Sequence, residues 1–187
     1  MKYLIIGLGN IGQEYENTRH NIGFDVCNKL VEMHNGTFAL DKLAHQATLK
    51  IKGKSIYVIK PTTYMNLSGK AVNYWMQHHK IPVENIFVIT DDIAIPFGSI
   101  RIRPKGSNGG HNGLGNIQEV LQTDVYTRLR FGVGGDFPKG KQVEYVLGKF
   151  SSEENEKLPE RINLAVEAIV SFCTIGLERT MNEFNKK

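Results

Sequence analysis

A histidine and an aspartate at two separate points of the sequence could together activate water. His20 lies in a polar stretch that follows an apolar run, and the apolar run NIFVITDD ends on Asp91 and Asp92. A histidine in a loop is usually a surface or capping residue unless a partner orients it, and a carboxylate at a strand end can be that partner. A His–Asp pair is the base half of a hydrolytic triad. Because no G-x-S-x-G motif or reactive cysteine supplies a nucleophile, we expect water itself to attack.

Two neutral amides lie beside expected helix starts. Asn66 occurs in TTYMNLSG and Asn112 in GGHNGLG. Either amide could cap a helix, or both could donate hydrogen bonds to an amide-rich ligand or to a developing oxyanion. The glycine-rich loop over 106–115 could also form a backbone nest for phosphate. Three basic residues precede this loop, namely Arg101, Arg103 and Lys105.

The segment GLGNIG matches the dinucleotide-binding pattern G-x-G-x-x-G and follows an expected strand. That pattern requires its third glycine, Gly12 here, to lie in the opening turn of a helix whose N-terminus binds pyrophosphate. The residues after Gly12 show no apolar periodicity until Ile22, and no strand ends in an acid about 20 residues further on. A loop at the end of the strand is therefore favoured, which would present Asn10, Tyr15 and His20.

Hydrophobic periodicity predicts strands that alternate with helices. The expected strands are 2–6, a hairpin that turns at Lys52-Gly53, NIFVITDD (85–92), GSIRIRP, TRLRFGVG and VEYVL. The expected helices are 22–34, a helix capped by Asn66 or Ser68 that reaches about His79, one from about Leu114, and a helical C-terminal third that opens with a capping box at Ser151 and Glu154 and is interrupted near Pro159. We expect a single α/β domain over residues 1–187, with a twisted mixed, mostly parallel sheet and helices on both faces. The chemistry of such sheets usually collects at the carboxyl ends of the strands.

Composition restricts the class of protein further. The 187 residues include 41% hydrophobic residues and suffice for one domain with a full core. No apolar run approaches the ~20 residues of a membrane span, and the N-terminal apolar run is too short for a signal peptide, so we expect a cytoplasmic protein. Cys27 and Cys173 lie in apolar segments, where we expect them to be reduced and buried. Neither the cysteines nor the six histidines show metal-ligand spacing, so no metal is expected.

The basic residues gather in two segments although the net charge is only +4. One segment holds the three basic residues at 101–105, and the other runs from Arg128 to Lys141. Such segregation is typical of a basic face toward a polyanion, although solvated loops with scattered bases give the same pattern.

Five segments together resemble the bacterial-type peptidyl-tRNA hydrolase family. They are GLGN-x-G-x-x-Y-x-x-T-R-H-N-x-G, PTTYMNLSG, DD before IP-x-G, GGHNGL and RLRFGVG, in this order from Met1 to about Phe150. The resemblance implies a monomeric α/β enzyme that cleaves the ester between a peptide and the 3′ end of tRNA, without a cofactor or metal. Its partner would be peptidyl-tRNA, with no membrane and no obligate protein partner.

The resemblance also implies roles for individual residues. His20 would be the general base, Asp91 would orient it, and Asn10 would position the substrate and favour blocked over free aminoacyl ends. The positions that match substrate contacts are Tyr15, Tyr64, Asn66 and Asn112; those that match tRNA phosphate contacts are Arg101, Arg103, Arg130 and Lys139, with Lys105 beside them. This sequence has arginine at 101 and 103 where many relatives have lysine, Tyr64 where phenylalanine is common, and Asp92 where glutamate is frequent.

Three other functions stay open at the level of sequence. A non-catalytic tRNA-binding module could use the same basic face. A nucleotide-cofactor enzyme could use the GLGNIG loop. A serine esterase is disfavoured because the nucleophile motif is absent.

Overall fold

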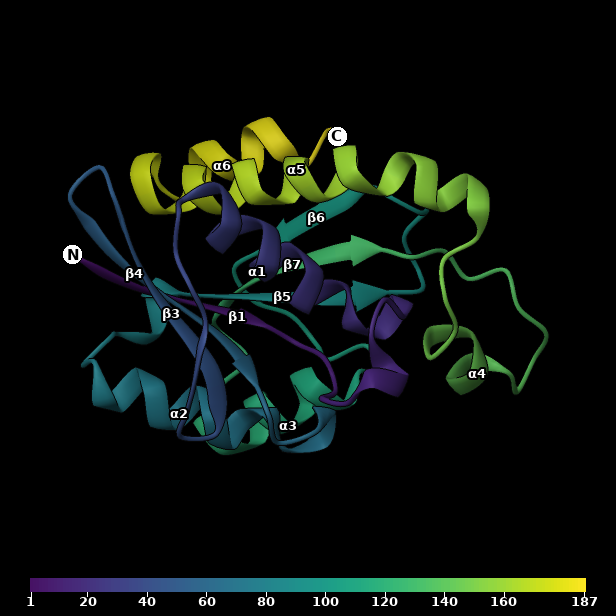
Figure 1. The fold of residues 1–187 in the computed structure, drawn as a ribbon, viewed down its shortest axis with the longest axis horizontal. Coiled ribbons are helices and arrows are strands. Elements are labelled where there is room, and N and C mark those ends of the chain that lie inside the picture. Colours follow the sequence, from purple (N-terminus) through teal and green to yellow (C-terminus); the bar gives the residue numbers. More distant parts are fainter.

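Seven strands form one sheet in the order β2-β3-β4-β1-β5-β7-β6 in the computed structural model, which describes residues 1–187 (Figure 1). The central strands β4, β1, β5 and β7 are parallel, and the outer pairs β2–β3, β3–β4 and β6–β7 are antiparallel. The strands are β1 (Lys2–Gly7), β2 (Ala39–Asp41), β3 (Ala44–Ile51), β4 (Lys54–Pro61), β5 (Ile86–Asp92), β6 (Ile100–Arg103) and β7 (Thr127–Gly132). The predicted single α/β domain with a mixed sheet is confirmed.

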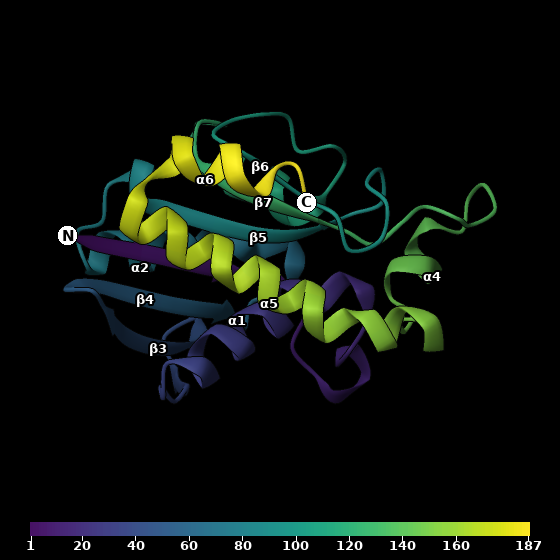
Figure 2. The same ribbon diagram turned by 90° about the horizontal axis from the view of Figure 1, so that it is seen from above.

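Helices cover both faces of the sheet. Figure 1 shows α1 (Ile22–Met33), α5 (Ser152–Ile175) and α6 (Leu177–Phe184) above the sheet, and α2 (Ser68–His78) and α3 (Asn112–Leu121) below it. The short helix α4 (Gln142–Val146) stands apart, beyond the carboxyl ends of the central strands, in both views (Figures 1 and 2). Short 3₁₀ turns occupy Gln13–Tyr15, Arg19–Asn21, Met65–Leu67 and Val83–Asn85.

The alternation of side chains along each buried strand supplies both layers of the core. In β1, Tyr3 and Ile5 pack with the α1–α5 layer, whereas Leu4 and Ile6 pack with the α2–α3 layer. These strands are apolar on both faces, as expected for parallel strands covered on both sides. Burial of each such side chain stabilises the fold by about 1.5–3 kcal/mol.

The helix α1 begins late, as the sequence predicted. Gly12 has a φ of 116°, in the region that favours glycine, and it leads into the 3₁₀ turn Gln13–Tyr15 rather than into an α-helix. The α-helix starts only at Ile22. The GLGNIG segment therefore lacks the helix N-terminus that a dinucleotide pyrophosphate requires.

Two predicted elements in the C-terminal half are wrong. The VEYVL segment lies mostly in the helix α4 and not in a strand, because five residues between a glycine-rich loop and Gly148 have no neighbouring strand to pair with. The helix α5 continues through Pro159 without interruption, since the buried residues of its C-terminal half hold it against the sheet. It ends instead at Gly176, whose φ is 97°. The capping box of Ser151 and Glu154 is confirmed.

None of the residues considered as caps of α2 and α3 caps these helices. Neither Asn66 nor Ser68 caps α2, because the 3₁₀ turn Met65–Leu67 leads directly into that helix and Ser68 Oγ donates to the Met65 carbonyl. Helix α3 begins at Asn112, and the residue before it, His111, is the cap. His111 Nδ1 accepts from the backbone N–H groups of Gly113 and Leu114 at 3.1 and 3.4 Å.

Strand β6 forms one edge of the sheet, and a side chain of the C-terminal segment pairs with it. The amide of Asn185 accepts from the Ile102 backbone N–H at 2.6 Å and donates to the Ile102 carbonyl at 3.1 Å. These two bonds take the place of a neighbouring strand at that residue.

Both cysteines are buried and unpaired, as predicted. Burial raises the pKa of Cys27 and of Cys173 to about 12, so neither thiol is reactive. The longest helices are either too short or too polar to cross a bilayer.

Candidate active site

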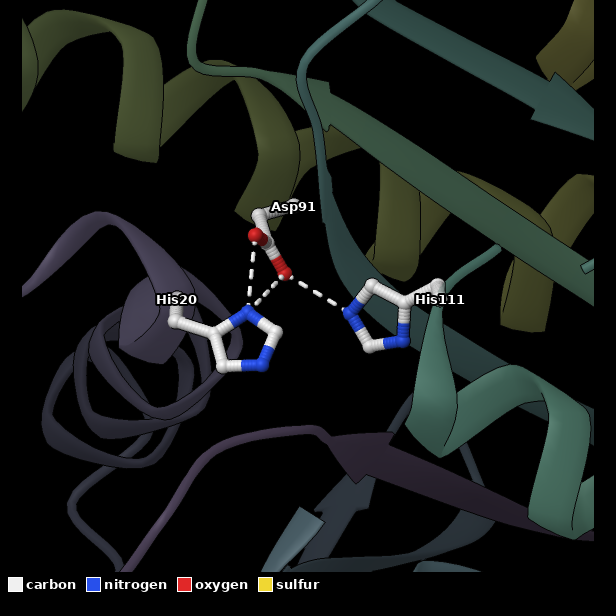
Figure 3. A group of neighbouring side chains, drawn as sticks. All are labelled: His20, Asp91 and His111. Carbon is white, nitrogen blue, oxygen red and sulfur yellow. Dashed lines mark hydrogen bonds and ion pairs between the residues drawn. The ribbon is translucent and has the colours of Figure 1, made fainter. Parts of the chain in front are cut away.

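Three side chains from separate parts of the sequence meet at the carboxyl ends of the central strands. His20 comes from the 3₁₀ turn between β1 and α1, Asp91 from the end of β5, and His111 from the residue that caps α3 (Figure 3). The carboxylate of Asp91 bridges the two imidazole rings, whose centroids are 5.1 Å apart. The predicted contact between His20 and Asp91 is present, and His111 was not predicted.

The hydrogen bonds define the tautomer of each histidine. His111 Nδ1 accepts two backbone N–H groups, so its proton lies on Nε2, which donates to Asp91 Oδ1 at 2.8 Å. His20 Nδ1 lies 2.9 and 3.0 Å from the two oxygens of Asp91, which accept its proton. The His20 Nε2 atom consequently keeps its lone pair, and His20 lines the cavity described below.

The carboxylate of Asp91 remains charged although it is buried. Burial by itself raises the pKa of Asp91, but the hydrogen bonds from His111 and His20 outweigh that effect and lower the pKa to about 2. A fixed negative charge beside His20 favours the protonated form that a base reaches during the reaction.

Asn10 is clamped beside this group by its backbone. Its N–H donates to Asn21 Oδ1 at 2.8 Å, and its carbonyl accepts from Asn21 Nδ2 at 2.8 Å. The side-chain oxygen of Asn10 accepts from the Met65 N–H at 2.7 Å. The amide nitrogen of Asn10 is left to donate to a ligand.

A cavity of about 680 Å³ opens over His20 and Asp91. Four predicted residues besides that pair line it, namely Asn10, Asn66, Asn112 and Arg130. His111 and the glycine-rich loop 107–110 line it as well. Of the remaining predicted residues, Tyr15, Tyr64, Arg101, Arg103, Lys105 and Lys139 lie outside the lining. The amide side chains thus converge on the His–Asp pair, whereas the predicted tyrosines and all of the predicted basic residues except Arg130 do not.

Val143 and Val146 of helix α4, and Leu147 directly after it, form one wall of this cavity. Arg19, the neighbour of His20, fixes this wall. Its guanidinium lies 4.1 Å from the centre of the Tyr145 ring and donates to Glu154 at 3.0 Å. The residue pair Arg19-His20 therefore connects His20 to the helix that lines the cavity.

The basic residues divide into structural and exposed ones. Arg128 is buried and donates to the Gly106 carbonyl at 2.9 Å, so it supports the glycine-rich loop and does not belong to the basic face. Arg130 donates to Ser107 O at 2.7 Å and pairs with Asp92 at 3.3 Å. Arg101 lies opposite Arg130 and Arg103 opposite Arg128 on the paired strands, with Arg103 exposed. Lys105 and Lys139 are exposed.

His20, Asp91 and His111 also carry ligand atoms of the kind that metals bind, all within 4.8 Å of one another. Their N–O separations of 2.8–3.0 Å are hydrogen-bond distances, and each imidazole directs an N–H at the carboxylate. A metal between them would displace those protons. The arrangement is that of two imidazoles held by hydrogen bonds to one carboxylate.

Comparison with known proteins identifies the family. The family model described as "Peptidyl-tRNA hydrolase" matches residues 4–187. The chain belongs to the peptidyl-tRNA hydrolase family. Among its relatives, the peptidyl-tRNA hydrolase of Cytophaga hutchinsonii is 59% identical and that of Parabacteroides distasonis 55% identical, each over the whole of both chains. The crystal structure of peptidyl-tRNA hydrolase from Acinetobacter baumannii has a TM-score of 0.91 and 33% identity, and the match covers 98% of this chain and 94% of that one.

Membership of the peptidyl-tRNA hydrolase family accounts for the sheet and the C-terminal helices together, since the matched residues include both. One site residue was missed at the sequence level. His111 stands in the motif GGHNGL directly before the expected helix. The available signal was its side-chain nitrogen, which can accept hydrogen bonds from the first N–H groups of that helix and so cap it.

Proposed function

We propose that this protein hydrolyses the ester between a peptide, or an N-blocked amino acid, and the 3′ end of tRNA, with His20 as general base. The observation that carries the proposal is the pairing of His20 Nδ1 with the buried Asp91, which leaves Nε2 available within the cavity. The names of the relatives support the same substrate.

The reaction requires one proton shuttle. His20 Nε2 removes a proton from water while the water oxygen attacks the ester carbonyl carbon. The tetrahedral intermediate then collapses, the bond to the ribose oxygen breaks, and that oxygen takes the proton from the imidazolium. The products are a peptide acid and free tRNA. A positioned base accelerates such a step by about 10²–10⁴.

The amides around the base would bind the acyl part of the substrate. Asn10 can donate its Nδ2 protons to a carbonyl oxygen, because its own oxygen is engaged by Met65. Asn66 and Asn112 lie in the same cavity and can hydrogen-bond peptide groups. A donor aimed at the developing oxyanion is worth about 10²–10³ in rate. An N-blocked end offers these amides a peptide group, whereas a free aminoacyl end offers an ammonium.

The tRNA would bind through its phosphates, without readout of base sequence. The proposed contacts are Arg101, Arg103, Lys105, Arg130 and Lys139. Tyr15 and Tyr64, which lie outside the cavity lining, would contact the substrate beyond it. In the same proposal the protein acts as a monomer in the cytoplasm and needs no cofactor.

The decisive test is release of tRNA from an N-acetylaminoacyl-tRNA and from the same tRNA with a free amino group. Wild-type protein should cleave the blocked ester and spare the free one. His20→Ala should lower kcat by about 10²–10⁴ and retain tRNA binding. His34→Ala, a histidine at the far end of α1, is the matched control and should keep wild-type rates.

The outcomes separate the alternatives. Near wild-type turnover by His20→Ala would refute the assignment of the base. Tight tRNA binding by the wild-type protein without cleavage of either ester would favour a non-catalytic binding module.

The proposed phosphate-binding residues have their own test. Arg101→Ala combined with Arg103→Ala should raise KM and leave kcat nearly constant. The slope of log KM against log salt should also flatten by roughly 0.7–0.9 for each phosphate that the variant no longer neutralises. Lys50→Ala, on β3 near the opposite edge of the sheet, is the control. An equal rise of KM in that variant would contradict the proposed location of the phosphate contacts on β6 and β7.

A further inference from the structure

A second cavity, of about 410 Å³, adjoins the active site through Asn10. Asn10 lines both cavities and stands between them, fixed by the backbone bonds to Asn21. The charged groups of the second cavity come from the loop after β1, from α1 and from β4: Glu16, Asp25 and Lys60. A substrate whose ester lies at His20 would pass Asn10 to reach this cavity.

The order of the strands indicates which part of the substrate would enter. The proposed phosphate contacts on β6 and β7 lie on one side of Asp91, whereas the second cavity lies across β1, beside β4 and β3. The two substituents of a scissile ester leave in opposite directions. If the tRNA extends toward β7 and β6, the peptide extends toward β4.

The carboxylate of Asp25 has no partner within the protein. It takes part in none of the ion pairs of the molecule. Burial raises the pKa of Asp25 to about 6, and the positive charges of Lys60 and Lys149 offset only part of that effect. A half-buried carboxylate without a donor is stabilised by a cation that enters the cavity.

The ammonium of Lys60 is already engaged. Its Nζ donates to Asn28 Oδ1 at 2.6 Å and lies 4.2 Å from the centre of the Phe38 ring. His45, directly opposite Lys60 on the paired strand, adds no charge, because burial and the positive charge of Lys60 lower the pKa of that imidazole. The ammonium of Lys149 also acts on Asp25 from outside the cavity lining, but it donates to the backbone carbonyl of Glu16. With Asp25 ionised, the two carboxylates therefore face two ammonium groups that are both already engaged by other acceptors.

We propose that this second cavity is a subsite for the peptide part of the substrate and that it takes a positively charged side chain close to the esterified residue. Asp25 binds the ammonium or guanidinium, and Glu16 adds negative charge at the rim. The inference rests on the proposed function, because it assumes that the peptide is held at His20.

The test compares two substrates on the same tRNA, N-acetyl-lysyl-glycyl-tRNA and N-acetyl-norleucyl-glycyl-tRNA, which differ by the ammonium group. The ratio of their kcat/KM values should favour lysine by about fivefold in the wild-type protein, the effect of one partly exposed ion pair. Asp25→Asn should bring the ratio close to one, and Lys60→Met should increase it. Asp41→Asn, an exposed aspartate on β2, should keep the wild-type ratio.

A ratio near one in the wild-type protein, or a lysine preference that survives in Asp25→Asn, would overturn the proposal. A titration with the product-like peptide N-acetyl-lysyl-glycine, followed by NMR, is independent of turnover. The amide signals of Asp25 and Lys60 should shift with this peptide and not with its norleucine analogue. If the ester of neither substrate is hydrolysed, the proposed function fails. Equal shifts of the amide signals with both peptides would overturn the subsite, whether or not the esters are hydrolysed.

Discussion

Asp91 and Asp25 are two partly or fully buried carboxylates on opposite sides of Asn10, and their pKa values are shifted in opposite directions. Asp91 accepts hydrogen bonds from His20 and His111, which overcome the effect of burial and lower its pKa to about 2. Asp25 accepts none from a neighbouring cation, and burial raises its pKa to about 6. Burial acts in the same sense on both groups, so the donors around a carboxylate decide whether its charge is stable.

The opposite pKa shifts suit different roles for the two carboxylates, Asp91 in the proposed reaction and Asp25 in the binding of a ligand. The charge of Asp91 is permanent at neutral pH, as an oriented base requires. The charge of Asp25 costs free energy in the empty cavity and would be stabilised by a cationic ligand, in line with the subsite proposed above.

Removing the charge of Asp91 should have the largest effect. In Asp91→Asn the amide presents one acceptor atom to two N–H donors, so one histidine must turn or change its tautomer. We expect kcat to fall by about 10²–10⁴, measured on N-acetylaminoacyl-tRNA, with an unchanged circular dichroism spectrum. Asp92→Asn, which removes the neighbouring negative charge and its ion pair with Arg130 but leaves Asp91 intact, is the control, and its kcat should fall far less.

The contribution of His111 can be separated from its capping role. In His111→Asn the shorter side chain can still cap α3 but cannot reach Asp91. We expect kcat to fall by about 10- to 100-fold, because the His20–Asp91 pair loses a restraint. The pKa of Asp91 should also rise toward its ordinary 3.8, so that acid unfolding begins at higher pH. Wild-type kcat together with an unchanged acid midpoint would show that His111 does not hold Asp91.

Asp25→Asn should act on stability rather than on the rate, and the substitution should stabilise the protein. Because the pKa of Asp25 is about 6 when folded and 3.8 ordinarily, its stability contribution is complete below pH 3.8 and is lost as the pH rises through 6. The loss is on the order of 2–3 kcal/mol. The asparagine variant should therefore be more stable than wild type at pH 7.5 and similar at pH 4, by urea unfolding at both values. Equal stability at pH 7.5 would contradict the raised pKa.

The His20–Asp91 pair could be predicted because its local signals are strong. The run IFVITDD is too apolar for any place but a buried strand, and its last residues must then lie at the carboxyl edge. The polar residues before Ile22 delay α1 and put His20 at the same edge. Both inferences depend on patterns within a few residues.

The features that were missed depend on contacts between distant segments. VEYVL has the composition of a strand, but Arg19 and Phe137 pack on Tyr145 of a short helix there. His111 is 20 residues from Asp91 in sequence, and only the fold brings them to 2.8 Å. The Asp25 cavity combines side chains of α1, β3 and β4, and no motif spans these elements.

The pairing of Asn185 with Ile102 has a consequence for self-association. An exposed edge strand offers unpaired N–H and C=O groups on which a second molecule can add a strand. In β6 the Asn185 amide occupies both groups of Ile102, and Arg101 and Arg103 on either side would repel an identical edge. The turn that contains Asn185 thus blocks strand addition at β6. A truncation before Asn185 would expose the backbone groups of Ile102 and favour aggregation at the edge where the tRNA is proposed to bind.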